Sequence, residues 1–508
     1  MDFLFRIFSY SADTPMLFTN HYFWGFFMVL LFFYSILYRN NILRNSYLFF
    51  MSLYFYYQSG GYFFSLLIFS TIADYTLGHL IHGAEKKRSR KFFLTISIII
   101  NLGLLAYFKY AYFLTDIFNQ VADSNIQVVN FLSLWYNEIA GEDLDISIIV
   151  LPVGISFFTF QTISYTFDIY RRKLKPVNNI IDFGFYVSFF PQLVAGPIVR
   201  AAEFIPQLYT SFRLTVQEMG HAVFLIVSGL IKKMVVADYI SINFVDRVFD
   251  NPLSYSGFEN LMAVYGYSVQ IYCDFSGYTD IAIGVALLLG FKLPINFNSP
   301  YKALNISDFW RRWHISLSSW LRDYLYIPLG GSRKGQLRKY SGLFITMLLG
   351  GLWHGAHLRF IIWGGLHGLA LAVHKLWEDL APSGLKAGGA GRGIWRFFSL
   401  FMTFQFVSFA WIFFRADDMQ VVNDMLTRIS SSFGAEHIIS ILSAHKSVFF
   451  LIFITLVIHW LPSKFKEYYR GLFIRTHLLV KVLVVVLLVF FIYQVKSADI
   501  QPFIYFQF

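Results

Sequence analysis

Two tryptophan–histidine pairs are the residues of this chain best suited to chemistry. Trp313 and His314 begin the sequence WHISLS, and Trp353 and His354 begin the sequence WHGA directly after two glycines. Histidine titrates nearest to neutral pH and is the side chain that most often moves protons in enzymes. Histidines in aromatic, glycine-rich surroundings therefore indicate a site for proton transfer.

The composition places this site in a membrane. Of the 508 residues, 56% are hydrophobic and 14% are charged, whereas a soluble protein carries about 25% charged residues. Lipid must therefore solvate much of the chain. We attribute the net charge of +11 to basic cytoplasmic loops and anionic membrane lipids rather than to a nucleic-acid partner. Cys273 is the one cysteine, so a thiolate metal cage is excluded, and we expect no metal.

Apolar segments separated by charged connections predict an all-α polytopic membrane protein. We expect spanning helices at about 22–38, 46–58, 62–81, 92–114, 147–170, 395–415, 447–461 and 478–493. With re-entrant helices in the middle, these give roughly 11 or more helices around a central cavity. The N-terminus lacks the signs of a cleaved signal peptide, so we expect the first spanning helix to direct insertion.

We expect residues 1–508 to form one integral membrane domain. It has three parts, namely N-terminal spans, a catalytic core and C-terminal spans, at residues 1–146, 147–380 and 394–508. The glycine-rich stretch 384–393 is typical of a flexible linker. The polar stretch 416–446 is typical of short helices at the outer interface.

Proline, glycine and charge interrupt the hydropathy of residues 180–375. The stretch DFSGYTD at 274–280 is one example. Backbone that departs from a helix at membrane depth is tolerated only where protein or a water-filled cavity surrounds it. We therefore expect short, tilted or re-entrant helices around a polar cavity, which is where a substrate site should lie.

His354 is the first candidate for a catalytic residue. Gly350, Gly351 and Gly355 allow another backbone or a ligand to approach it closely, and Trp353 supplies a rigid apolar wall. An ionisable group inside a bilayer is costly and needs a reason. The alternative is a histidine that only hydrogen-bonds a neighbouring helix, which is a common use of polar groups in membranes.

His314 is the second candidate. Its alternative interpretation is an interfacial histidine beside arginines that reach toward the headgroups. We expect His357 and His367 to be packing or cavity-lining groups. His367 follows His354 on nearly the same helix face if the helix between them is unbroken.

Further candidates for substrate binding are polar residues in otherwise apolar stretches: Gln270, Asp274, Ser276 and Tyr278. A buried carboxylate must be paired, so Asp274 and Asp280 are expected to pair with nearby arginines. The alternative is that they orient a hydroxylated substrate or a catalytic histidine. Arg322 lies in a charged segment that is either a solvated loop or a docking surface for an anionic donor.

Several motifs together resemble the membrane-bound O-acyltransferase superfamily. They are FWRRWHISLS at 309–318, WLRDY at 320–324 and GGLWHG at 350–355. Other motifs resemble the bacterial alginate O-acetyltransferase branch, namely FPQL at 190–193, GPI at 196–198, DFSGYTD at 274–280 and FFRA at 413–416. Related proteins that export D-alanine to teichoic acids share much of this pattern. The resemblance extends from the first span to about residue 417.

The resemblance implies a multi-helix body in which a funnel from each side meets near His354. It implies that His354 is catalytic and that His314 fills the family's second polar position. The implied donor substrate is acetyl-coenzyme A or a carrier-bound acyl thioester, with no permanently bound cofactor. The implied acceptor is a hydroxyl of an extracytoplasmic polysaccharide or of an exported acetyltransferase partner protein. The implied location is the bacterial cytoplasmic membrane.

Three other functions stay open at this point. The chain could export D-alanyl or another acyl group to a cell-envelope polymer. It could be a transporter, since broken helices at the midplane also mark substrate paths, although no inverted repeat is visible. It could also be a membrane scaffold for polysaccharide export, with catalysis elsewhere.

The connections between spans alternate in charge and predict the topology. Residues 86–91 and 171–175 are basic, whereas every charged residue of 115–146 is acidic, and basic loops face the cytoplasm. The N-terminus, the 115–146 loop and the C-terminus should therefore lie outside, and 384–393 inside. An impermeant thiol reagent added outside cells should label Ser124→Cys and miss Ser89→Cys. The reverse labelling pattern would contradict this topology.

Overall fold

The structure is a computed structural model that describes residues 9–11, 15–140, 145–194, 196–380 and 392–495. Helices and their connections account for all of these residues, and no strand occurs among them, which confirms the all-α prediction. The chain forms two compact units, Met1–Phe212 and Arg213–Phe508. Within the described part of the chain, four helices are long and apolar enough to span a membrane, or up to six if each of two bent helix pairs counts as one span. The expected total of roughly 11 stays a prediction.

The first unit contains ten α-helices among its described residues. They are α2 (His21–Leu37), α3 (Asn41–Gly60), α4 (Phe64–Gly83), α5 (Lys87–Leu105), α6 (Ala111–Ala122), α7 (Phe131–Ala140), α8 (Ile155–Tyr170), α9 (Ile180–Ser188), α10 (Phe190–Leu193) and α11 (Ala201–Leu208). The start of α8 differs from the prediction of about 147. Gly154, directly before α8, has a φ of +73°, and a helix does not continue through such a residue.

A buried carboxylate joins three helices of this unit. Asp74 of α4 is fully buried. It accepts hydrogen bonds from Ser97 Oγ at 2.6 Å and from Asn101 Nδ2 at 2.7 Å, both on α5. Thr162 of α8 donates to Asn101 Oδ1 at 2.8 Å. Because a buried polar group is costly without partners, this network fixes how α4, α5 and α8 pack.

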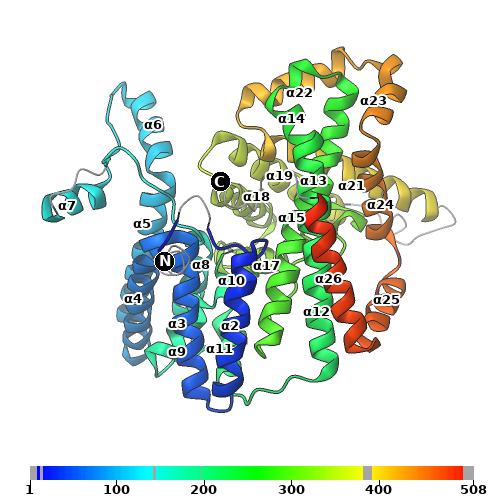
Figure 1. Ribbon diagram of the computed structural model, residues 1–508. Helices are drawn as coiled ribbons and strands as arrows, with labels where there is room; N and C mark the ends of the chain where they lie inside the picture. The colour runs from blue at the N-terminus through cyan, green and yellow to red at the C-terminus, as the bar shows by residue number, and fades with distance from the viewer. Residues whose placement is uncertain (1–8, 12–14, 141–144, 195, 381–391, 496–508) are drawn as a thin grey trace. The chain divides into compact units, whose positions relative to one another are not determined.

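The second unit combines long helices with short and irregular ones. Its α-helices are α12 (Val216–Leu230), α13 (Asp238–Ile240), α14 (Asp246–Asp250), α15 (Gly257–Leu288), α16 (Ile306–Arg312), α17 (Ile315–Leu321), α18 (Gln336–His354), α19 (Leu358–Leu380), α21 (Arg392–Arg415), α22 (Met419–Ser431), α23 (Ile438–Ala444), α24 (Lys446–Trp460), α25 (Ser463–Arg475) and α26 (Leu478–Val495). α12 packs along α15, and α26 packs on α12 (Figure 1). Most of the predicted linker 384–393 lies outside the described residues.

Three π-helical segments interrupt this unit: η3 (Ile231–Ala237), η4 (Ser241–Val245) and η7 (Arg322–Tyr326). Single turns of π-helix are rare and often occur near functional sites. Together with the short helices α16 and α17, they confirm that the middle of the chain is irregular. Residues 416–446 contain the expected short helices, α22 and α23.

Residues 274–280 interrupt the hydropathy, but α15 runs through them without a break. The charges are paired instead. Lys233 Nζ lies 2.8 Å from Asp274 Oδ1, and Lys232 Nζ lies 2.6 Å from Asp280 Oδ2. The pairing is structural, as expected, but the partners are lysines of η3 rather than arginines.

Lys233 also pairs with Asp238 Oδ1 at 2.7 Å, and only 3% of its side chain is exposed. Replacing it with methionine removes the cation and leaves two buried carboxylates behind. Breaking such a buried pair costs about 3–5 kcal/mol. We therefore expect Lys233→Met to lower the free energy of unfolding by about this amount in a detergent unfolding titration.

Lys292→Met is the matched control. Lys292 pairs with Glu218 at 3.0 Å, but 73% of its side chain is exposed. An exposed pair contributes less than about 1 kcal/mol. Equal losses of stability in the two variants would show that the pairing of Lys233 does not hold η3 on α15.

Candidate active site

His354 is the last residue of α18 and lies in a pocket of aromatic rings. Its residue exposure is 4%. The centre of its ring lies 4.9 Å from that of Trp353, 5.1 Å from that of Trp363 and 5.2 Å from that of Phe414. The imidazole therefore has large apolar surfaces around it, in a site from which bulk water is largely excluded.

Glycine contacts between α18 and α19 place His354 in this pocket. A Cβ atom at Gly351 would lie 2.2 Å from the Phe360 carbonyl oxygen, and one at Gly364 would lie 2.4 Å from the Met347 carbonyl oxygen. No larger residue fits either position without moving the backbone. The expectation that Gly351 allows close approach of another backbone is thus confirmed. This contact also brings Trp363 of α19 against His354 of α18.

His367 lies on a different helix from His354. The condition for a shared helix face is not met, because α18 ends at His354 and α19 begins at Leu358. His367 is fully buried, and its Nδ1 accepts a hydrogen bond from Trp310 Nε1 at 3.3 Å. Its ring lies 4.8 Å from that of Trp363. His367 thus packs behind the wall of the His354 pocket, whereas His357 is exposed in the connection.

His314 lies at the junction of α16 and α17 in a left-handed conformation, with a φ of +43°. Such a φ is uncommon for a residue other than glycine and often marks a functional position. The junction is held by Asn296, whose carbonyl accepts from the Ile315 amide at 3.0 Å and whose Oδ1 accepts from the Ser316 amide at 3.1 Å. These contacts fix the backbone that carries His314.

Trp353 contacts both candidate histidines. The centre of the His314 ring lies 6.4 Å from that of Trp353. It lies 4.7 Å from the centre of the ring of Phe275, which belongs to α15. His314 is fully buried and lies outside the candidate membrane-spanning helices. Burial lowers the pKa of His314 to about 3, so this imidazole is neutral at physiological pH. The structure thus brings His314, Trp353 and His354 together.

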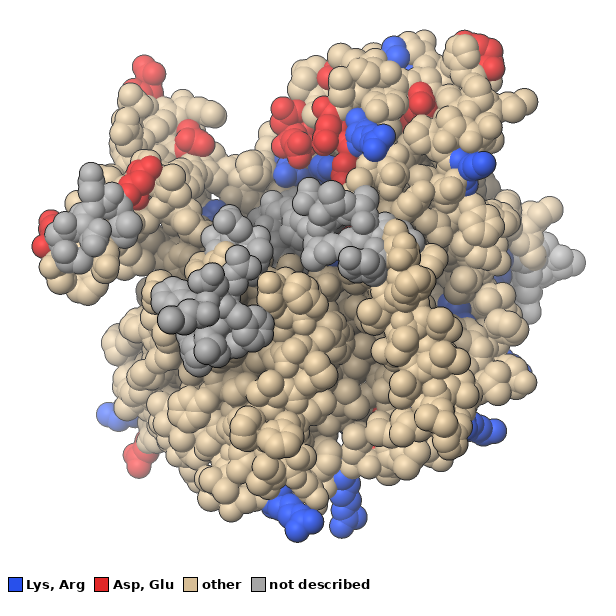
Figure 2. Space-filling model, in the orientation of Figure 1, with Lys and Arg blue, Asp and Glu red and all other residues tan. Residues whose placement is uncertain are grey.

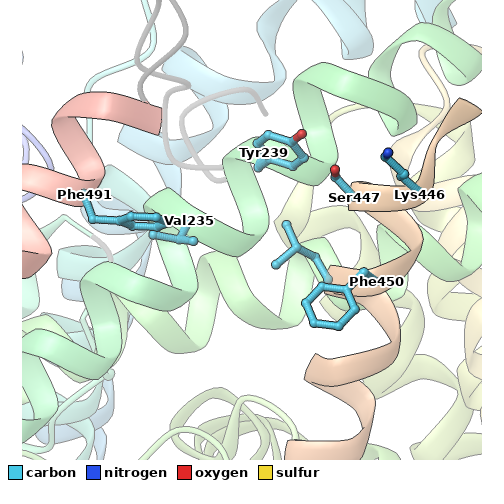
Figure 3. A pocket seen from close by; sticks show the side chains of 7 residues that line it. Val235, Tyr239, Lys446, Ser447, Phe450 and Phe491 are labelled. Carbon is cyan, nitrogen blue, oxygen red and sulfur yellow. The ribbon is translucent and has the colours of Figure 1, made fainter.

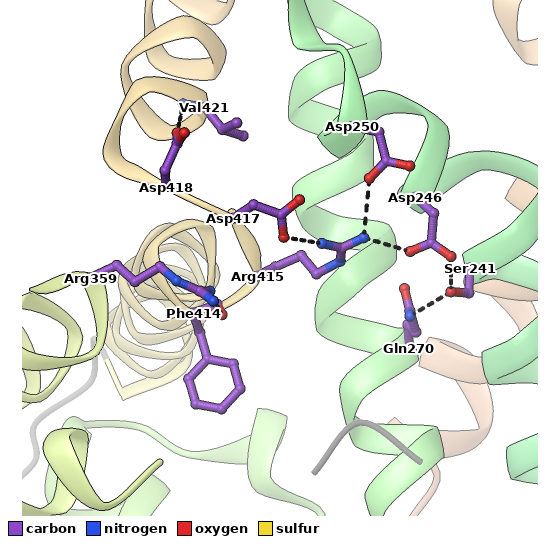
Figure 4. Close-up of polar contacts among 10 residues, drawn as sticks. All are labelled: Ser241, Asp246, Asp250, Gln270, Arg359, Phe414, Arg415, Asp417, Asp418 and Val421. Atoms are coloured by element: carbon purple, nitrogen blue, oxygen red, sulfur yellow. Dashed lines mark hydrogen bonds and ion pairs between the residues drawn. The ribbon is translucent and has the colours of Figure 1, made fainter. Parts of the chain in front are cut away.

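A polar network connects α15 with the neighbouring helices (Figure 4). Gln270 Nε2 donates to Ser241 Oγ at 2.9 Å, and Ser241 donates to Asp246. Asp246 Oδ1 pairs with Arg415 at 3.0 Å. Gln270 is 9% exposed, and its Oε1 has no hydrogen-bond partner among the residues that the structure describes.

The outer part of this network is acidic and exposed. Arg415 lies 3.6 Å from Asp250 and 3.5 Å from Asp417, whose side chains are 62% and 74% exposed. Figure 2 shows acidic and basic side chains gathered over α14 and α22. Charged and polar side chains therefore form a continuous series of contacts from the surface to the buried Gln270.

The remaining predicted site residues differ in position. Ser276 and Tyr278 are 1% exposed on α15, next to Phe275, which contacts His314. Asp274 forms an ion pair with Lys233. Arg322 is not part of the buried group, since 62% of its side chain is exposed and it pairs with Asp323 at 2.7 Å.

Buried basic groups that the sequence did not predict include Lys233 and Arg359. Lys233 is 2% exposed and Arg359 is 7% exposed, and Arg359 Nη1 donates to the Phe414 carbonyl at 2.9 Å. Phe414 is also a wall of the His354 pocket, so Arg359 supports that wall. Adjacent lysines in an otherwise apolar stretch were a usable signal for Lys233. For Arg359, its position shortly after the Trp353–His354 pair was a signal that it could lie near the site.

Residues 104–414 match the model of the membrane-bound O-acyltransferase family. The chain is 38% identical over 381 residues to a peptidoglycan O-acetyltransferase of Helicobacter pylori, which covers 70% of this chain and 68% of that protein. It is 34% identical over 463 residues to a probable alginate O-acetylase of Pseudomonas putida, and this match covers 86% of this chain and 89% of that protein. It is 30% identical over 246 residues to a teichoic acid D-alanyltransferase of Bacillus subtilis, and this match covers 44% of this chain and 59% of that protein.

The matched segment contains both tryptophan–histidine pairs and ends at Phe414, in the wall of the His354 pocket. The chain is thus an O-acyltransferase that belongs to the membrane-bound O-acyltransferase family, in its alginate O-acetyltransferase-like branch.

Proposed function

We propose that this protein transfers an acetyl group from a cytoplasmic thioester to a hydroxyl on the far side of the bacterial cytoplasmic membrane. The observation that carries this proposal is the enclosure of His354 by Trp353, Trp363 and Phe414 within the segment that matches the family. The similar proteins are named for the acetylation of alginate and of peptidoglycan. A polysaccharide, or an exported protein that acetylates one, is the acceptor that we propose.

The proposed reaction needs a base for the acceptor hydroxyl. A hydroxyl is a weak nucleophile until its proton is removed, and a neutral imidazole in an apolar pocket is suited to remove it. His354 takes the proton as the acceptor oxygen bonds to the thioester carbonyl carbon. The carbon–sulfur bond then breaks, and the imidazolium returns the proton to the leaving thiolate.

The neighbouring residues would position the reactants. His314 is held rigidly at its junction and would orient His354 or the thioester carbonyl, and Trp353 would form the wall between the two histidines. The buried Oε1 of Gln270 supports a role for this residue in binding an acceptor hydroxyl. Ser276 and Tyr278 are candidates for the same role. Asp274 would act indirectly, since its carboxylate is already paired with Lys233.

A second candidate function is the transfer of a D-alanyl group. It is favoured by the 30% identity to a teichoic acid D-alanyltransferase. The proposed chemistry at His354 is the same, because both reactions attack an acyl thioester. Mass spectrometry of cell-envelope polymers with and without the protein distinguishes them, since an acetyl and a D-alanyl ester differ in mass.

His354→Ala should abolish acyl transfer while the protein still folds and inserts. Removing a general base typically lowers the rate by about 10²–10⁴-fold. The measurement is ester content of the polymer at matched protein abundance. His357→Ala is the control, since His357 is exposed in the connection after α18 and should change the rate little. Near-normal acylation by the His354→Ala variant would refute its role as the base.

The donor should approach the cytoplasmic side near Arg322 and Arg333. Both are exposed, and guanidinium groups bind phosphates of a nucleotide-type donor well. Replacing both with glutamine should raise the donor KM, more strongly at low salt, with little change in acceptor dependence. An unchanged donor KM with normal insertion would show that these charges only orient the protein in the membrane.

A further inference from the structure

A groove lies between two apolar helices of the second unit (Figure 3). Its volume is about 560 Å³, within the range of small-ligand sites, which is about 300–1,000 Å³. α24 and α26 both contact η3, which forms the floor of the groove. Phe450 and Phe491 line it from α24 and α26, and Val235 lines it from η3.

The groove is polar at one end and apolar at the other. Lys446, Ser447 and Tyr239 lie together in Figure 3, whereas Val235 and Phe491 lie at the opposite end. Lys446 is exposed, and its ammonium group has no ion pair or hydrogen bond among the described residues. It is also the first residue of α24, whose following residues are almost all apolar. The cation therefore lies where an apolar membrane helix begins.

We propose that this groove binds an anionic phospholipid, with an acyl chain between α24 and α26 and the phosphate at Lys446. The ammonium group offers charge to a phosphate oxygen, and the hydroxyls of Ser447 and Tyr239 offer hydrogen bonds. Basic pockets between membrane helices bind anionic lipid headgroups in this way. The polarity of the groove matches that of a lipid from head to tail.

The lining residues favour a lipid over a membrane helix of another protein. Helices that pack closely in membranes meet through small residues. The α12–α15 contact of this unit has that character, since a Cβ at Gly229 would lie 2.5 Å from the Gly277 carbonyl oxygen. The apolar part of the groove is instead lined by Val235, Phe450 and Phe491, which hold a helix backbone away but accommodate a flexible chain.

The test uses the purified full-length protein, delipidated in detergent and titrated with phosphatidylglycerol or with phosphatidylcholine of the same acyl chains. Bound lipid is counted by native mass spectrometry. We expect phosphatidylglycerol to bind more tightly than phosphatidylcholine. Lys446→Gln should weaken phosphatidylglycerol binding about five-fold, the effect of roughly one lysine at an anionic lipid, and weaken phosphatidylcholine binding less, because the choline cation already neutralises the phosphate of that lipid. Val235→Trp should fill the groove and weaken both lipids.

Lys464→Gln is the control, because Lys464 is an exposed lysine of α25 outside the groove. If Lys464→Gln and Lys446→Gln weaken phosphatidylglycerol binding equally, the proposal is overturned. The lipid would then be attracted by the basic surface as a whole and not by the groove. Displacement of the lipid by inorganic phosphate at equal concentration would overturn it in favour of a phosphate site. A polypeptide that co-purifies with the unaltered protein but not with Val235→Trp would show that a protein helix occupies the groove.

Discussion

A hydrogen-bonding or charged group inside a membrane protein must find its partner within the protein, and this constraint organises both units. In the first unit, Asp74 receives hydrogen bonds from two α5 side chains and so holds three helices in one arrangement. In the second, Lys233 pairs with Asp274 and Asp238 and fixes η3 against α15. Such networks are costly to leave incomplete, so they specify one packing of helices whose apolar faces alone would allow several.

The same constraint explains the surroundings of the candidate base. His354 ends α18 among three aromatic rings, and the close contact of Gly351 with α19 brings one of these rings, Trp363, into place. The proposed proton transfer would take place there with little competition from water. His314 reaches the same wall from a strained junction that Asn296 braces. The positions of both candidate histidines thus depend on packing contacts between helices.

The sequence predicted those features that depend on local patterns. Apolar runs located α2, α24 and α26 within a few residues, and the two tryptophan–histidine pairs are buried together as expected from their surroundings. Features that depend on tertiary contacts were missed. The charges of 274–280 were expected to pair with arginines, but their partners are Lys233 and Lys232, which lie in η3.

Arg322 is exposed and paired with its neighbour Asp323, a position that fits both of its interpretations, a solvated loop and a docking surface. The contact of Trp353 with both histidines also requires α18 to meet the α16–α17 junction, which no local pattern encodes. Gln270 was identified from its type alone, and the structure adds the buried oxygen that makes it a candidate for binding an acceptor.

The most direct test of the account is the sidedness of the reaction in sealed proteoliposomes that contain the purified, uniformly oriented protein. Labelled acetyl-coenzyme A is supplied at the face that carries the basic loops, and a soluble polysaccharide acceptor is sealed at the other face. The account predicts labelled acetyl ester on the acceptor and an equal amount of free coenzyme A on the donor side. Ester that forms only when donor and acceptor share one face would contradict transfer across the membrane through the His354 pocket.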